Sequence, residues 1–181
     1  MGNTIYKTKE EWAEVSGTEE LINEWEAENE LNLPDDYKKF MVKYNGGILY
    51  PLIFNHNIPL ELWPSGEELL YLDSLHPWDY GALLWRDESQ SYPRPKNTLE
   101  IGSDPGGIGV ILSLQAQSYG QIFLNLSFAV PGDGEPKLRN YHLANSFREF
   151  VFEKLYETSD REGYDYWYSS DAEKNAKKVE F

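Results

Sequence analysis

The chain has 181 residues, of which 16 are basic, 31 acidic and none cysteine, and its formal net charge is −15 at neutral pH. This charge argues against direct binding to nucleic acid or an anionic membrane, and the absence of cysteine excludes disulfides, thiolate-ligated metals and thiol catalysis. The length suits one domain with a sizeable core, so we expect a single domain over residues 1–181.

The start of the chain carries no sign of a membrane or export segment. Residues 1–12 lack the apolar core of a signal peptide, and no apolar run approaches the roughly 20 residues of a membrane span. We therefore expect a cytoplasmic protein that does not enter a membrane.

The first predicted helix covers residues 18–28. Ser16 with Glu19 three residues later has the spacing of a capping box at its start. The predicted buried stripe consists of Leu21, Ile22 and Trp25, with Trp12 packed beneath. The outer face is acidic, as expected of a solvated surface, and consists of Glu20, Glu24, Glu26 and Glu28.

The second predicted helix, residues 34–45, has the clearest local signals in the chain. Pro34 suits a helix start, and Asp35 and Asp36 place negative charge at the positive end of the helix dipole. An apolar stripe at helical spacing follows, formed by Tyr37, Phe40, Met41 and Tyr44. Asn45-Gly46-Gly47 then supplies residues that tolerate positive φ where the helix must end.

After Gly47 the pattern changes to short apolar runs, which predict strands at residues 48–54 and 69–75. Pro51 makes the first of these an edge strand or a bulged one. Residues 75–97 show no clear period, and we expect the longest irregular stretch of the chain there. Its aromatic and acidic side chains either form a protein-binding surface or, in the case of Trp78 and Trp85, cap the core.

The next segment predicts a meander of antiparallel strands at residues 98–102, 109–114 and 121–126, because tight turns separate them. The glycines near residue 106 open a strand and are followed by no Gly-Lys-Ser/Thr, so they indicate a turn and not a phosphate loop. A short strand at 141–143 and a helix at 146–157, begun by Ser146 and Glu149, come next. In the tail, residues 158–181, Tyr164, Tyr166 and Tyr168 alternate as in an added edge strand or a docked arm.

Three stretches together resemble the SUKH superfamily, which includes the Smi/Knr type fungal cell-wall regulators and many bacterial immunity proteins. They are the LPDDYKKF…YNGG sequence of residues 33–47, IGSDPGGIGVILSL at 101–114 and NSFREFVFEKL at 145–155. The resemblance covers about residues 12–157. It implies the scaffold of the superfamily and a non-catalytic, protein-binding role.

Catalytic patterns are weak in this sequence. His56, His76 and His142 are far apart and none has metal-ligand spacing, and no serine lies in a nucleophile motif. A carboxylate pair such as Asp79 with Glu88 leaves a hydrolase open as an alternative. We expect no metal and no cofactor.

The sequence therefore predicts an α+β fold, with a central, mostly antiparallel sheet of about six strands and three or four helices around it. The resemblance and the charge suggest an immunity protein that blocks a basic toxin, such as a nuclease, with a regulatory scaffold protein as the alternative. The negative charge supports this because it lies mainly in residues 1–136. The predicted contact residues are Trp78, Asp79, Trp85, Asp87, Glu88 and Asp104.

Overall fold

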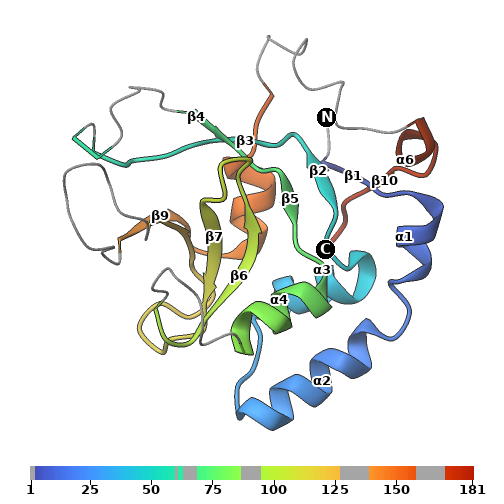
Figure 1. Ribbon diagram of the computed structural model, residues 1–181, viewed down its shortest axis with the longest axis horizontal. Coiled ribbons are helices and arrows are strands. Elements are labelled where there is room, and N and C mark those ends of the chain that lie inside the picture. Colours follow the sequence, from blue (N-terminus) through green and yellow to red (C-terminus); the bar gives the residue numbers. More distant parts are fainter. Residues whose placement is uncertain (1–2, 60, 63–68, 87–94, 127–138, 158–169) are drawn as a thin grey trace.

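The structure is a computed structural model that describes residues 3–59, 61–62, 69–86, 95–126, 139–157 and 170–181. It is an α+β protein, as predicted (Figure 1). Its helices are α1 (Lys9–Ala13), α2 (Thr18–Asn29), α3 (Asp35–Tyr44), α4 (Trp78–Arg86), α5 (Phe147–Glu149), the π-helix η1 (Phe150–Lys154) and α6 (Ser170–Lys174). Its strands are β1 (Thr4–Tyr6), β2 (Ile48–Tyr50), β3 (Ile53–Asn55), β4 (Leu69–Tyr71), β5 (Ser74–Leu75), β6 (Thr98–Ser103), β7 (Gly109–Ser113), β8 (Ile122–Asn125), β9 (Asn140–Ala144) and β10 (Lys177–Lys178).

The main sheet contains five strands in the order β5-β6-β7-β8-β9, and every neighbouring pair is antiparallel. The predicted meander is therefore confirmed. We expected about six strands in one sheet; the other described strands form a three-stranded sheet, β10-β1-β2, and the pair β3-β4. The strand predicted at 48–54 divides at Pro51, which cannot donate a backbone hydrogen bond, and its halves pair with β1 and β4 respectively.

Helix α3 lies at the centre of the helical part, as its local signals predict. Tyr37, Phe40, Met41 and Tyr44 are all buried. The helix ends through Asn45, Gly46 and Gly47, whose φ angles are 49°, 71° and 119°. The buried Lys7 donates from Nζ to the carbonyl oxygens of Tyr44 and Asn45, at 3.0 and 2.9 Å. A cation therefore caps the negative end of the helix.

Two details of the predicted helices are wrong. Helix α2 has Gly17 as its N-cap without a side-chain hydrogen bond, so Ser16 and Glu19 do not form a capping box. The capping box in this region belongs to α1, between Thr8 and Glu11. Leu21 is also 51% exposed and so does not belong to the buried stripe of α2.

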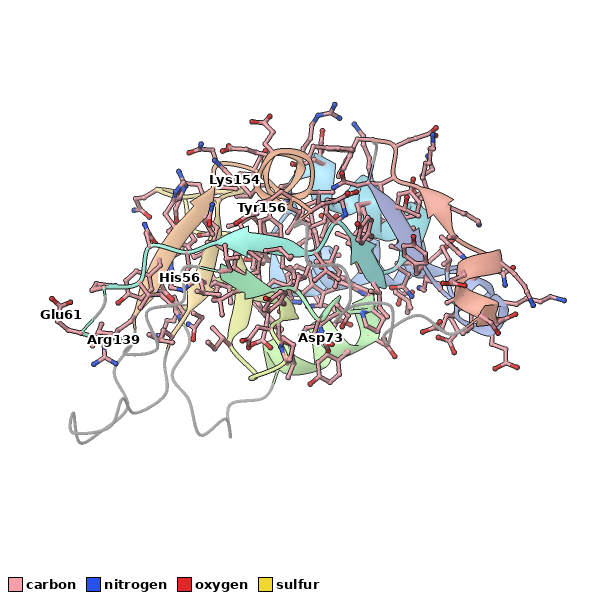
Figure 2. All side chains as sticks on the ribbon, turned by 90° about the horizontal axis from the view of Figure 1, so that it is seen from above. His56, Glu61, Asp73, Arg139, Lys154 and Tyr156 are labelled. Atoms are coloured by element: carbon pink, nitrogen blue, oxygen red, sulfur yellow. The ribbon has the colours of Figure 1, made fainter. Side chains whose placement is uncertain are left out.

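The helix predicted at 146–157 begins where expected but ends early. Ser146 is the N-cap and accepts from the backbone N–H of Glu149. The helix then widens into η1 and stops at Lys154. Beyond it, the backbone N–H of Tyr156 donates to Ile53 and the Tyr156 hydroxyl donates to Asn55, so pairing with β3 replaces further helical turns (Figure 2).

Residues 75–97 contain a helix, which contradicts the irregular stretch that we expected. Helix α4 begins directly after Pro77, and Trp78, Gly81, Ala82 and Trp85 fall at i, i+3, i+4 and i+7. It packs on β6 and on α2. A Cβ on Gly81 would lie 3.4 Å from the carbonyl oxygen of Glu100, an ordinary contact distance, so this face of α4 lies directly against β6.

The two ends of the chain pair with each other through β1 and β10. Trp12 lies against Tyr44, with ring centroids 6.3 Å apart, and donates from Nε1 to the carbonyl of Asn175. The final residue, Phe181, packs on Phe40, Phe147 and Phe152. The alternating tyrosines at 164–168 lie outside the described residues.

Candidate partner-binding groove

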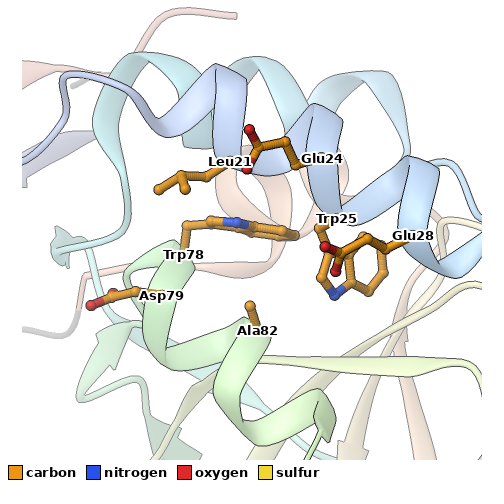
Figure 3. Close-up of a pocket in the computed structure, with 7 residues that line it drawn as sticks. All are labelled: Leu21, Glu24, Trp25, Glu28, Trp78, Asp79 and Ala82. Atoms are coloured by element: carbon orange, nitrogen blue, oxygen red, sulfur yellow. The ribbon is translucent and has the colours of Figure 1, made fainter.

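A surface groove of about 390 Å³ lies between α2 and α4 and opens to solvent. We call it the α2–α4 groove. Figure 3 shows α2 along one side of it and α4 along the other, with the ring of Trp78 between them. Its lining residues are Leu21, Glu24, Trp25, Glu28, Trp78, Asp79 and Ala82.

Aromatic side chains from the two helices form the floor. The ring of Trp25 meets that of Trp78 edge to face at 5.5 Å and that of Trp85 at 5.1 Å. The backbone N–H of Trp78 donates to Asn45 Oδ1 at 2.7 Å, and Trp85 Nε1 donates to Asn29 Oδ1 at 3.2 Å. These bonds fix α4 to the end of α3 and to the end of α2, so the floor is held rigidly.

The indole nitrogen of Trp25 differs from its neighbours. Trp25 is 2% exposed, and no described residue accepts a hydrogen bond from its Nε1. Buried donors normally have partners, because an unsatisfied one costs about 1–3 kcal/mol. The Trp25 ring therefore carries a buried hydrogen-bond donor that has no acceptor among the described residues.

Carboxylates surround this apolar floor. Glu24 and Glu28 are exposed on α2, and Asp79 is exposed on α4. Helix α2 contains five glutamates and no basic residue; its Glu26 pairs at 2.7 Å with Lys38 of α3. The rim of the groove is thus negatively charged, while its floor is aromatic.

The structure brings three of the six predicted contact residues to this place. Asp79 and Trp78 line the groove, and Trp85 packs against Trp25 behind it. Trp78 is 3% exposed, so it presents only a small part of its ring to solvent. Asp87 and Glu88, which follow α4, lie outside the described residues.

Asp104 is in a different position, at the turn between β6 and β7. It is 8% exposed, and its Oδ1 accepts from the backbone N–H of Ile108 at 2.6 Å. Its pKa lies above the ordinary value, because burial penalises the carboxylate more than the N–H groups of the turn favour it. The carboxylate holds the turn together and does not line the groove.

The contribution of α2 to the groove was not predicted. The sequence pattern indicates a core position for Trp25 and a solvated face for Glu24 and Glu28, and in the structure Trp25 is buried and both glutamates are exposed. The spacing of Trp78, Gly81, Ala82 and Trp85 was the signal that could have revealed α4 as a second helical wall.

Among the described residues, no group of three or more histidine, aspartate or glutamate side chains has the arrangement of a metal site. The carboxylate pair considered for hydrolysis, Asp79 with Glu88, includes a residue outside the described part. Asp79 itself lies on an open rim and accepts a hydrogen bond from its neighbour's N–H, Tyr80 N, at 2.9 Å.

None of the helices within the described ranges is long and apolar enough to cross a membrane.

Comparison with known proteins gives a family match but no individual relative. The sequence model of the SMI1/KNR4 family (SUKH-1) matches residues 17–153. This range includes α2, α3, α4, the main sheet and the start of η1. No curated protein and no solved structure matches the chain. Because the match spans well over half of the sequence and contains both walls of the groove, the chain belongs to the SMI1/KNR4 (SUKH-1) family.

Proposed function

We propose that this protein is a non-catalytic binding protein of the immunity type, which neutralises a cognate toxin by covering the toxin's active site. The observation that carries the proposal is the α2–α4 groove, where an aromatic floor and an acidic rim meet on the surface of a SUKH-1 domain. Aromatic anchors surrounded by polar groups are typical of the energetic centre of a protein–protein interface.

The charge of the chain favours a basic partner. Enzymes that act on nucleic acid have electropositive sites because they must attract phosphate. A protein with a net charge of −15 would associate rapidly with such a site through electrostatic steering, and its bulk would then exclude the substrate. A nuclease toxin is therefore the partner class that we propose, within the cytoplasm.

We place the contact surface on α4 and the chain that follows it, with α2 beside them. The residues concerned are those of the groove and the predicted contacts Trp85, Asp87 and Glu88. Asp104 belongs to the proposed surface only if the partner extends to the β6–β7 turn. The fold would then serve as a rigid scaffold and the contact residues would determine which toxin is bound.

The test is affinity capture from a lysate of the cells that naturally produce the protein, at low and at high salt, with mass spectrometry of the retained proteins. We expect one dominant basic partner that is released at high salt. The triple charge reversal Asp79→Lys/Asp87→Lys/Glu88→Lys should then weaken binding and flatten its salt dependence.

Several weakly bound partners, or none, would contradict the immunity role and would favour a general regulatory scaffold of the same fold. If a single partner is captured but the triple reversal changes neither its affinity nor the salt dependence, the role stands and the placement of the surface is wrong.

A further inference from the structure

We propose that Asn45 is a site of spontaneous deamidation, and that the packing of α1 and α4 around its side chain controls how fast it reacts. Reaction there loosens the start of α4, which forms one wall of the α2–α4 groove. This inference goes beyond the proposed function, because it does not depend on the identity or the existence of a partner. It follows from the two residues that the fold requires where α3 ends.

The turn that ends α3 requires glycine at position 46. Its φ angle is 71°, and a Cβ there would lie 2.5 Å from the carbonyl oxygen of His76, in the segment that leads into α4. Only glycine combines this angle with so close an approach. The backbone nitrogen that follows Asn45 is therefore the one that no side chain of its own residue can shield.

Position 45 requires asparagine for a different reason, which is the set of hydrogen bonds that its side chain makes. Its φ angle of 49° lies in the left-handed region that asparagine tolerates better than most residues. Oδ1 accepts from the backbone N–H of Trp78 at 2.7 Å, and Nδ2 donates to the carbonyl oxygen of Glu14 at 3.3 Å. One side chain therefore joins the end of α3 to the first residue of α4 and to the C-cap of α1.

The two requirements together place a reactive pair in the chain. The Gly46 nitrogen attacks Asn45 Cγ, a bond forms between these two atoms, and the bond from Cγ to Nδ2 breaks. The proton of the Gly46 N–H ends on the departing nitrogen, which leaves as ammonia. Water then opens the resulting succinimide at either carbonyl and gives aspartate or isoaspartate. The net reaction consumes one water and releases one ammonia, and nothing is oxidised or reduced. Because the first step is intramolecular, its rate depends on how the two atoms are held.

The folded structure holds this side chain in an unreactive arrangement. Asn45 is 7% exposed. Ammonia leaves from the nitrogen that donates to Glu14, and the carbonyl that is attacked is the one that accepts from Trp78, so reaction breaks both contacts. Lys7 also restrains the main chain, because its ammonium donates to the carbonyl oxygen of Asn45 at 2.9 Å. The rate should therefore follow the population of molecules in which α1 and α4 have opened locally.

The products cannot restore these contacts. In aspartate, a carboxylate oxygen replaces Nδ2 and has no proton to donate to the Glu14 carbonyl, and its charge lies near the negative end of the α3 dipole. In isoaspartate, the main chain runs through the former side-chain carbonyl, so the group that accepted from Trp78 becomes part of the backbone. The anchor at the start of α4 is then lost irreversibly.

The first test compares the full chain with the capped peptide acetyl-Lys-Tyr-Asn-Gly-Gly-amide, which contains residues 43–47 without the fold. Both are incubated at the same pH and temperature, and peptide mapping by mass spectrometry measures aspartate and isoaspartate at Asn45. We expect the folded chain to react more slowly than the peptide by about tenfold or more, and the chain unfolded in urea to approach the peptide. Equal rates for the folded chain and the peptide, or no reaction in the peptide, would overturn the proposal.

Two variants separate local opening of α4 from unfolding of the whole chain. Trp85→Phe removes the hydrogen bond from Trp85 Nε1 to Asn29 that holds α4 on α2. Ile53→Val removes one methylene from the buried side of β3, far from α4 (Figure 1). After correction for overall stability by urea unfolding, Trp85→Phe should speed deamidation of the folded chain by about fivefold, the factor expected for one lost hydrogen bond. Ile53→Val should leave the corrected rate unchanged. Equal rates in the two variants would overturn control by the helices, since global unfolding alone would then expose Asn45.

The consequence for α4 is tested on the isoaspartate form itself. This form is separated by ion exchange, because it carries an additional negative charge, and is compared with unreacted chain from the same incubation. Hydrogen exchange of the Trp78 backbone amide, which Asn45 Oδ1 protects, should be faster in the isoaspartate form by about tenfold. Unchanged exchange at Trp78 would show that Asn45 does not anchor α4.

Discussion

The buried side chain of Tyr37 makes the stability of the fold depend on pH in the alkaline range. It is 2% exposed in the first turn of α3, with its ring 5.1 Å from that of Phe147. Burial raises its pKa above the ordinary value of 10.0, so the unfolded chain loses this proton before the folded one does. The stabilisation is therefore complete below about pH 10 and is lost as the pH rises further.

We predict that Tyr37→Phe, which has no ionisable hydroxyl, flattens the alkaline fall in the free energy of unfolding. Urea unfolding curves between about pH 8 and pH 11 measure this slope. Tyr80→Phe removes a hydroxyl from a residue that is 46% exposed and serves as the control. Identical alkaline slopes in the wild type and Tyr37→Phe would show that the hydroxyl of Tyr37 ionises in the folded protein as easily as in the unfolded one.

Gly46 and Gly17 show two different reasons why a position requires glycine: a positive φ angle alone, or a positive φ angle together with a lack of space for a Cβ. Both have positive φ, at 71° and 90°. A Cβ on Gly46 would lie 2.5 Å from the carbonyl oxygen of His76, whereas nothing lies within 4 Å of a Cβ on Gly17. We predict that Gly17→Ala lowers stability by about 1 kcal/mol, the strain of a left-handed residue alone. Gly46→Ala should cost about 3 kcal/mol or more, because the backbone must also move. Urea unfolding of the two variants provides the comparison. Similar losses of stability would contradict this prediction, because they would mean that the backbone at Gly46 and His76 moves apart at little cost.

At the scale of whole elements, the C-terminal arm, residues 177–181, is one of the parts of the fold that lie outside the family match. Strand β10 pairs with β1, and Phe181 packs on Phe40, Phe147 and Phe152 at 6.1, 5.9 and 5.2 Å. We predict that Phe181→Ala lowers the free energy of unfolding by about 1–2 kcal/mol, less than a fully buried phenylalanine because Phe181 is partly exposed.

The neighbouring Glu180 is the matched control for that variant. Its carboxylate pairs with Lys43 at 3.2 Å on the surface, and such exposed pairs contribute about 0–1 kcal/mol. Glu180→Ala should therefore have the smaller effect in thermal unfolding. If the two variants were equally stable, the packing of Phe181 on the core would contribute no more to stability than the exposed ion pair of Glu180.

The elements differ in how well the sequence predicts them, and α3 and α4 show why. The start, apolar stripe and end of α3 all lie within fifteen residues, so local rules are sufficient. Helix α4 contains Gly81, which has low helix propensity, and its stripe is aromatic. The contacts of α4 with β6 and α2 outweigh this low propensity, and tertiary contacts of this kind cannot be read from the sequence.

The groove was less predictable than either helix, because it is a product of two distant segments. Trp25 and Trp78 are more than fifty positions apart, and each pattern alone indicates a buried aromatic residue. Their pairing at 5.5 Å depends on how α2 and α4 pack together. Aromatic and acidic composition pointed to the α4 side as a candidate contact region, whereas the contribution of α2 is visible only in the structure.

At the scale of the whole molecule, the net charge of −15 connects function with stability. The same acidic surface that would steer a basic partner also repels itself in the folded state. Attractive pairs oppose this effect, among them Glu26 with Lys38 at 2.7 Å and Glu149 with Lys154 at 2.9 Å. Lys154 and Asn145 lower the pKa of Glu149 to about 2, so this second pair remains charged well into the acidic range.

We predict that the general repulsion outweighs these pairs, so that salt stabilises the protein. Raising NaCl from about 0.01 M to about 0.5 M shortens the screening length from roughly 30 Å to a few ångströms, which removes long-range repulsion before it removes close contacts. The urea midpoint should rise by an amount equivalent to about 1 kcal/mol. Glu24→Gln/Glu28→Gln/Asp79→Asn, which removes three of the negative charges, should show a smaller rise. A midpoint that falls with added salt would mean that the ion pairs dominate. Repulsion among the acidic side chains would then not destabilise the folded state, and a basic partner would gain no affinity by relieving it.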